Sequence, residues 1–319
     1  METIIDRLLN SPDPAVRYKV KTNVLGHEPG DAAVYELRQE IKTSPHARAL
    51  LAQVDPPSNM PPGPYRKWTG AHWVLADLAD MGYPPGDETL LPLRQQIYDW
   101  LFGKKHQKQI WTIAGRVRRC ASQEGNALFY LLALGLGDQG TDELARRLVA
   151  WQWPDGGWNC DKNPAARHSS FMESLIPLRG LALHARLSGD PDSKAAASRT
   201  AEIFLKRHLF RRQSDGTIID QDFVRLHYPC YWHYDILFAL KVLAEAGFIG
   251  DPRCAAALDL LESKRLPDGG FPAEHRYYRI SDKPVSNRSL VNWGGVSKKH
   301  LNEYVTVDAL AVLRAAGRL

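Results

Sequence analysis

Gln152-Trp-Pro-Asp-Gly-Gly-Trp158 and Arg265-Leu-Pro-Asp-Gly-Gly-Phe271 are two copies of one sequence phrase, and Arg212-Gln-Ser-Asp-Gly-Thr-Ile218 is a weaker third copy. Proline presets φ, aspartate binds nearby backbone and glycine accepts a positive φ, so Pro-Asp-Gly is typical of a turn. The aromatic residue at the end of the first two copies would fix the turn against neighbouring structure. Recurrence of the phrase predicts an internal repeat with one such loop per unit.

The segments around these loops have helical spacing. Leu144, Leu148 and Trp151 precede the first loop at intervals of three and four, and no segment sustains the alternation of a strand. We therefore expect an all-α chain without strands. Strongly apolar helices are expected at residues 70–82, 123–137, 169–187, 231–247 and 303–317. More polar helices are expected at residues 88–102, 142–152, 193–209 and 252–264.

This alternation of apolar and polar helices predicts two layers. An apolar helix buries most of its surface, whereas a polar helix keeps one face in water, so the apolar helices should be inner and the polar ones outer. A first hairpin is expected at residues 4–9 and 15–25, with Asp13 as N-cap and Pro14 in the first turn.

The helical pattern continues on both sides of the proline-rich stretch 56–64, which is expected to be a loop. We therefore predict one domain over residues 1–319, with N-terminal helices in residues 1–55 and the repeat region in residues 65–319.

Composition disfavours several classes of protein. Hydrophobic residues make up 44% and charged residues 24% of the chain, as in an ordinary soluble globular protein. The apolar run 127–136 is far shorter than the roughly 20 residues that span a bilayer, and residues 1–10 lack a signal-peptide layout. A net charge of +5 without a long basic run does not favour nucleic acid. Four scattered cysteines favour reduced thiols. We expect a cytoplasmic protein that spans no membrane.

The stretch from Gln152 to Trp158, with Gly156 between them, resembles the glutamine–tryptophan repeat of squalene and oxidosqualene cyclases. These enzymes and the protein prenyltransferase β-subunits share an α/α toroid, in which an inner ring of helices surrounds an apolar cavity. The resemblance, which covers most of the chain from about residue 70, implies the same fold here. It is nearest to short, single-domain bacterial squalene-cyclase-like or prenyltransferase-repeat proteins. Arg265 and Arg212 replace the glutamine in the other copies, so the repeat supports the fold more than the chemistry.

The motifs that carry chemistry in these families are incomplete. Class II terpene cyclases use an Asp-x-Asp-Asp tetrad to protonate an alkene, and no such tetrad occurs in this sequence. Protein prenyltransferases bind zinc with an Asp-x-Cys pair and a later histidine. The stretch from Tyr228 to Tyr231 resembles that pair through Cys230 but lacks the acid.

In a toroid every inner helix starts on the same side, so residues at successive helix starts would meet at one mouth. These positions include Cys120, Cys160, His168 and Cys230. Thiolate and imidazole are ligands that Zn²⁺ prefers, so these four residues are candidate zinc ligands. In the alternative interpretation the cysteines are small buried residues and the histidine binds backbone, with no metal. No CxxC or HExxH spacing decides between the two.

Asp235 is the candidate catalytic acid. On a helix that starts at residue 231, Tyr231, Asp235 and Phe238 share one stripe. If the stripe faces a cavity, its aromatic walls would favour the protonated acid, which could donate a proton. If it faces outward, Asp235 is an ordinary ion-pair partner. His233 is the second catalytic candidate, although a dyad with Asp235 needs one of the two outside regular helix, since they diverge by about 200°.

Aromatic side chains gather near the same helix starts, where their faces could contact an apolar ligand or stabilise a cation. The candidate ligand-binding residues are Phe171, Tyr231, Trp232, Tyr234, Phe238 and Tyr304. The leading hypothesis is a terpenoid-cyclase-like enzyme, acting as a lyase or isomerase, or an isoprenoid-binding relative with an apolar central cavity. The alternative is a non-catalytic ligand-binding or scaffold toroid that binds zinc.

Overall fold

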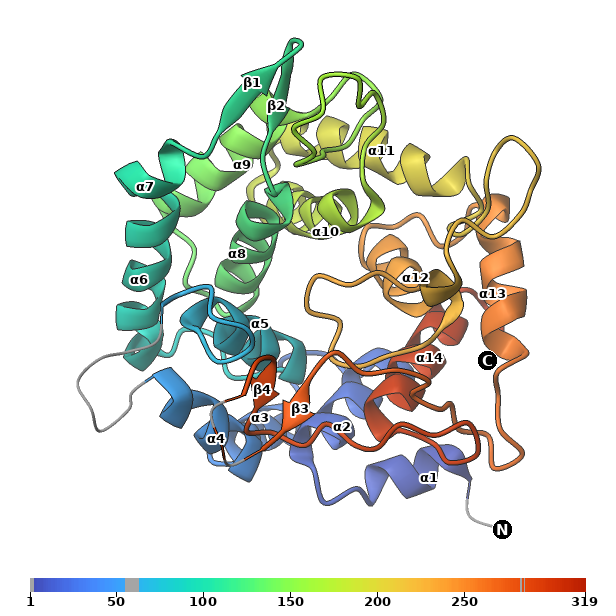
Figure 1. Cartoon of the computed structure of the whole chain (residues 1–319). Helices are drawn as coiled ribbons and strands as arrows, with labels where there is room; N and C mark the ends of the chain where they lie inside the picture. The colour runs from blue at the N-terminus through green and yellow to red at the C-terminus, as the bar shows by residue number, and fades with distance from the viewer. Residues whose placement is uncertain (1–2, 55–62, 282, 284) are drawn as a thin grey trace. The chain divides into compact units, whose positions relative to one another are not determined.

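The computed structural model describes residues 3–54, 63–281, 283 and 285–319. These residues form fourteen α-helices, three 3₁₀ helices, one π-helix and four short strands (Figure 1). The expected all-α class is confirmed. Within the described ranges, no helix combines the length and the apolar character that crossing a membrane requires.

The chain divides into two compact units, each built from stretches that are far apart in sequence. The first unit combines Met1–Pro85, Val224–Tyr231 and Leu258–Leu319. The second unit combines Gly86–Phe223 and Trp232–Ala257. The boundary between the second unit and the last stretch of the first, at Ala257 and Leu258, lies within helix α13 (Ala255–Glu262).

The first unit contains six α-helices, the π-helix and a pair of two-residue strands. The elements are α1 (Ile4–Leu9), α2 (Pro14–Lys19), η1 (Val20–Leu25), α3 (Ala32–Lys42), α4 (Pro45–Val54), α5 (Ala71–Met81), β3 (Arg279–Ile280), β4 (Arg288–Ser289) and α14 (Glu303–Ala315). Asp13 caps α2 through the backbone N–H of Ala15, as expected, and Pro14 is the first helical residue.

The second unit contains the candidate functional site. Its elements are η2 (Glu88–Leu90), α6 (Leu91–Leu101), α7 (Lys104–Gln107), β1 (Trp111–Ile113), β2 (Arg116–Arg118), α8 (Ala121–Ala133), α9 (Gln139–Trp151), α10 (Phe171–Ser188), α11 (Pro191–Leu205), α12 (Ile236–Glu245) and η4 (Pro252–Cys254). The short helix η3 (Gln221–Val224) ends at a boundary between units.

The predicted apolar helices agree with the structure where a capping signal marks their ends. The helices expected at 70–82, 169–187 and 303–317 correspond within two residues to α5, α10 and α14. Helix α5 ends at Gly82, which has a left-handed φ of 82° that glycine adopts without strain. The helix expected at 123–137 is α8, shifted toward the N-terminus. The helix expected from residue 231 is wrong at its start, because α12 begins at Ile236.

The expectation that the chain has no strands is also wrong in detail. Strands β1 and β2 pair antiparallel, and Ala114 and Gly115 between them have φ values of 51° and 70°. Two positive φ values in a two-residue loop form the turn that matches the twist of a β-hairpin. Strands β3 and β4 are a parallel pair of two residues each. Segments this short do not provide enough alternation to be recognised as strands in the sequence.

The two strong copies of the repeat phrase form the same turn. The N–H of Trp153 donates to the carbonyl of Gly157 at 2.8 Å, and Leu266 donates to Gly270 at 2.8 Å. After each turn, a hydroxyl on the following long helix accepts the aromatic residue's N–H: Ser174 from Trp158 at 3.1 Å and Thr306 from Phe271 at 2.9 Å. These matching contacts confirm the internal repeat.

The third copy of the phrase forms a different turn. There the N–H of Arg212 donates to the carbonyl of Thr217 at 2.8 Å, which closes a wider loop. This copy lacks the proline, the second glycine and the aromatic residue of the two others.

Helices α8 and α10 pack more extensively than any other pair in the second unit. Glycine makes this approach possible, because a Cβ atom on Gly125 would lie 2.6 Å from the Cα and N atoms of Pro177. A Cβ atom on Gly180 would likewise lie 2.5 Å from the carbonyl oxygen of Gly125. Close packing of the two backbones holds the N-terminal ends of α8 and α10 at a fixed spacing, and these ends carry the candidate site.

Candidate functional site

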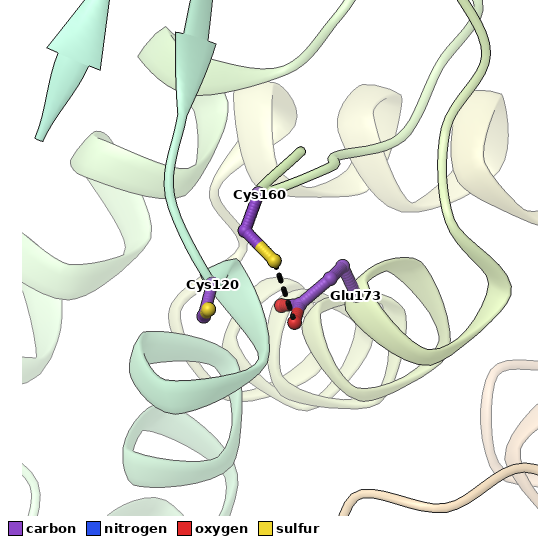
Figure 2. Close-up of side chains that lie close together, drawn as sticks. All are labelled: Cys120, Cys160 and Glu173. Atoms are coloured by element: carbon purple, nitrogen blue, oxygen red, sulfur yellow. Dashed lines mark hydrogen bonds between the residues drawn. The ribbon is translucent and has the colours of Figure 1, made fainter. Parts of the chain in front are cut away.

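Three side chains of types that can bind a metal ion lie close together in the second unit, where α8 and α10 begin (Figure 2). One ligand atom from each of Cys120, Cys160 and Glu173 lies within 4.8 Å of the others. Cys120 is the N-cap of α8, Glu173 lies in the first turn of α10, and Cys160 lies in the loop between α9 and α10. All three side chains are half-buried, so they remain accessible to a small ligand.

Helix capping positions the carboxylate. Ser170 caps α10, and its hydroxyl accepts the backbone N–H of Glu173 at 3.4 Å. The Oε2 atom of Glu173 then accepts the backbone N–H of Ser122 at 3.0 Å. Because the first N–H groups of a helix have no partner inside the helix, Glu173 serves as a cap for α8 from the neighbouring helix. Its Oε1 atom stays on the side of Cys160, whose Sγ lies 3.6 Å away.

A buried arginine holds the loop that carries Cys160. The Arg118 guanidinium donates to the carbonyl oxygens of Asp161 and Ala166, both at 3.1 Å. Arg118 is 1% exposed and lies 4.3 Å over the Trp153 ring. Because Arg118 is two residues before Cys120, one short segment supplies a thiol and also fixes the loop that supplies the other.

The three groups share protons. The hydrogen bond between the two thiols raises the pKa of Cys120, and burial and the charge of Glu173 add to this effect. The same interaction lowers the pKa of Cys160, and the Cys160 thiol donates to Oε1 of Glu173 at 3.6 Å. Burial raises the pKa of Glu173. The two thiols and the carboxylate are therefore coupled, so that the loss of a proton from one of them changes the pKa of the others.

A buried network of charged side chains lies beside the site. The Nε2 atom of His106 lies 2.7 Å from Oε1 of Glu124, and both residues are at most 3% exposed. Arg119, adjacent to Cys120, donates to Gln123 at 2.5 Å, and its Nη2 atom lies 2.7 and 2.8 Å from the two ring nitrogens of His106. Glu124 therefore pairs within this network and is not one of the three grouped ligands.

The structure brings together two of the four predicted metal ligands. Cys120 and Cys160 are in the group, whereas His168 is an exposed residue of the same loop, whose carbonyl accepts from Asn159 at 2.9 Å. Cys230 belongs to the first unit. The third member of the group is Glu173, which was not among the predicted ligands. The Ser170-x-x-Glu173 spacing of a helix start was the sequence signal that could have identified it.

Asp235 is the N-cap of α12. Its fully buried side chain accepts the backbone N–H of Phe238 at 2.7 Å. The predicted stripe of Tyr231, Asp235 and Phe238 is wrong, because Tyr231 precedes the helix and has a φ of 48°. His233 also precedes the helix, so helical spacing does not relate it to Asp235 or to Cys230.

The predicted ligand-binding aromatics pack against other rings. Phe171 meets Tyr234 edge-on at 4.9 Å, and the Tyr234 hydroxyl donates to the carbonyl of Leu209 at 2.5 Å. In the first unit, Tyr231 stacks on Trp68 at 3.8 Å and Tyr304 stacks on Tyr228 at 4.4 Å. Trp232 stacks on His233 at 4.0 Å, and Phe238 is 4% exposed. These contacts are those of core aromatics.

No protein-family model matches the chain, and no curated protein is significantly similar to it.

Proposed function

We propose that this protein binds one zinc ion through Cys120, Cys160 and Glu173. The observation that carries the proposal is the convergence of two thiols and a carboxylate within 4.8 Å. Zinc takes sulfur and carboxylate ligands and prefers four of them. Three protein ligands leave one position for water or a substrate, which is the arrangement of catalytic rather than structural zinc sites. A zinc ion bound there would act as a Lewis acid and lower the pKa of a bound water to about 7.

The residues around the site have separate tasks in this proposal. Ser122 orients the Glu173 carboxylate, and Arg118 holds the Cys160 loop in place. Such outer contacts fix the direction of metal ligands and are as important as the ligands themselves. The positive charge of Arg119 favours the thiolate form of Cys120.

A redox-active thiol pair is the second candidate. The proximity of the Cys120 and Cys160 sulfur atoms, within 4.8 Å of each other, favours it, because two neighbouring thiols can form a disulfide on oxidation. Glu173 favours zinc over this alternative, since its charge opposes a thiolate at Cys160 and its carboxylate is a ligand for a cation.

We also propose that the helices belong to an α/α toroid with an isoprenoid-like ligand, so that any reaction would be of the terpenoid-cyclase type. Support comes from the glutamine–tryptophan loop, where the Gln152 amide donates to the carbonyls of Gly156 and Ala196, both at 2.9 Å. The Trp158 indole donates to the carbonyl of Leu148 at 3.0 Å. A non-catalytic zinc-binding toroid is the alternative, and conversion of isoprenoid diphosphates or squalene by the zinc-loaded protein would separate the two.

Metal content tests the zinc proposal. Protein purified without a metal-affinity tag should contain about one equivalent of zinc by elemental analysis. Cys120→Ser, Cys160→Ser and Glu173→Gln should each lose most of it, whereas Cys230→Ser is the matched control and should retain it. Less than about a tenth of an equivalent in the reconstituted wild type would reject the proposal. A Cys120–Cys160 disulfide that forms reversibly in a glutathione buffer would then favour the redox pair.

A further inference from the structure

A groove runs along the C-terminal half of α10, away from the candidate metal site. It consists of two adjoining hollows of about 340 Å³ and about 260 Å³, which share Ala182 and Arg186. We call this feature the α10 groove. The larger hollow lies between α10, the end of α8 and Glu245 of α12, and the smaller one extends toward α11. The volume of the larger hollow is at the low end of small-molecule sites.

The walls of the larger hollow are mostly apolar. Phe129, Leu132, Leu183 and Leu187 line it, and Leu187 is 62% exposed to solvent. Arg179 lies 3.6 Å over the Phe129 ring and forms two bonds to Glu245, at 2.6 and 2.7 Å. That bidentate pair neutralises Arg179 and makes it part of the wall.

The remaining charge in the groove is positive. Arg186 and Lys194 are both exposed and line the smaller hollow, and neither side chain has an ion pair with another described residue. Lys194 lies near the start of α11, where the helix dipole favours an anion. Arg186 lies in the last turn of α10, where the dipole opposes an anion, so attraction there depends on the side chain itself.

We propose that the α10 groove binds a single-chain amphiphile with an anionic head. The hydrocarbon tail lies against Phe129, Leu183 and Leu187, and the carboxylate or phosphate head lies between Arg186 and Lys194. A guanidinium donates two parallel hydrogen bonds to such a head, and an ammonium adds a point charge. The hydrophobic effect supplies affinity for the tail, in proportion to the apolar area that it covers.

This site is independent of the proposed zinc site. Arg186 lies thirteen residues after Glu173 on α10, which corresponds to about 20 Å along a helix. Loss of zinc should therefore leave amphiphile binding unchanged, and the two proposals fail separately.

Displacement of a fluorescent fatty acid tests the site. Monomeric cis-parinarate should gain fluorescence with the full-length protein, and oleate should displace it below its micellar concentration. Arg186→Gln should weaken oleate binding at least about tenfold, while binding of oleyl alcohol, which lacks the charge, should change less than about twofold. Arg146→Gln, on an arginine whose side chain is 73% exposed on α9, is the matched control and should bind oleate like the wild type.

A second variant tests whether the hydrocarbon tail binds in the α10 groove. Ala182→Leu adds volume where the two hollows meet and should weaken oleate and oleyl alcohol alike, with circular dichroism confirming that the variant is folded. Equal oleate affinity in Arg186→Gln and the wild type would overturn the proposal. So would failure of oleate to displace the probe, or binding that occurs with phosphatidylglycerol vesicles but not with monomeric amphiphile.

Discussion

Cys120, Cys160 and Glu173 compete for the same protons, and a divalent cation would have to displace them. The pKa of Cys120 is raised by its hydrogen bond to Cys160, and the pKa of Glu173 is raised by burial. Both groups must lose a proton before they bind a metal ion.

Zinc affinity should therefore increase with pH. Each proton that zinc displaces contributes about tenfold in apparent affinity per pH unit, as long as the pH lies below the pKa of that group. Between pH 6 and pH 8 we expect the dissociation constant to fall by at least about a hundredfold. Competition with a chromophoric chelator at several pH values measures this, and a constant affinity over that range would contradict the shared-proton description of the site.

Asp77, on α5 in the first unit, should make stability depend on pH. Its side chain is buried at 6% exposure, and burial followed by the charge of Asp80 raises its pKa well above the usual 3.8. The folded state therefore binds this proton more tightly than the unfolded chain does. Its favourable contribution is complete below pH 3.8 and is lost as the pH rises through the folded-state pKa.

Replacement of Asp77 by Asn should remove that pH dependence. Relative to Asp77→Asn, the wild type should be least stable above the folded-state pKa of Asp77 and should gain stability toward pH 4. Urea unfolding of both proteins between pH 4 and pH 8 gives the difference directly. If the free energy of unfolding changed with pH in the same way for both proteins, the Asp77 carboxyl group would not stay protonated in the folded state.

Asp235 should behave as a helix cap. Asp235→Ala should lower the free energy of unfolding by about 1–2 kcal/mol, because the N–H of Phe238 loses its acceptor. Asp235→Asn should cost much less, since asparagine caps helices about as well as aspartate. If Asp235 were an acid catalyst, Asn would instead be as damaging to activity as Ala, because both remove the transferable proton. Chemical denaturation of both variants, with turnover once a substrate is known, separates the roles.

Among the secondary-structure elements, helices α8 and α10 cross with their backbones in close contact at Gly125 and Pro177. Gly125→Ala places a methyl group 2.6 Å from backbone atoms of Pro177, which cannot move aside as a flexible side chain would. We expect a loss of about 1–3 kcal/mol in stability, typical of overpacking, and weaker zinc binding because the helices must separate. Gly250→Ala is the control, since nothing lies within 4 Å of its added Cβ. Thermal unfolding and zinc titration of both variants provide the comparison.

Helix ends could be predicted where the capping signal was recognised as one, and the start of α12 was missed because its signal was not. Gly82 and the Asp13-Pro14 pair marked real helix ends. The start of α12 was missed because the residues from Tyr231 to Tyr234 are aromatic enough to continue the helical pattern. Asp235 was the true N-cap signal, but it was interpreted as a catalytic acid.

Only part of the candidate site could be predicted for a related reason. Position at a helix start identified Cys120, because a start can be located from the pattern alone. The same rule named Cys160, but the sequence could not show how the Cys160 loop closes around the Arg118 guanidinium to bring the thiol there. Cys230 and His168 satisfied the same positional rule without joining the group.

For the whole molecule, the division into two compact units raises the question of whether they fold separately. If the chain is a single cooperative domain, a fragment that contains one unit should be unfolded. If the two units are independent, such a fragment should fold alone. Residues 86–257 contain the entire second unit with only Val224–Tyr231 of the first.

Residues 86–257 expressed alone should show helical circular dichroism and bind zinc, because all three ligands and the packed helices α8, α10 and α12 are included. Retention of a cooperative unfolding transition would establish the unit as independent. A fragment 86–223, which lacks α12, is the control and should be less stable. An unfolded 86–257 fragment would instead favour one cooperative domain over residues 1–319.

Arg118 has a consequence for how long the proposed ion stays bound. Its two hydrogen bonds, to the carbonyls of Asp161 and Ala166, hold the Cys160 loop in place. A metal ion dissociates from such a site by breaking one ligand bond at a time. Because the Cys160 loop is held in place, its sulfur atom would stay close to the ion and rebind before the next bond breaks. The exchange lifetime of a bound zinc ion should then depend largely on Arg118, although Arg118 is not one of the proposed ligands.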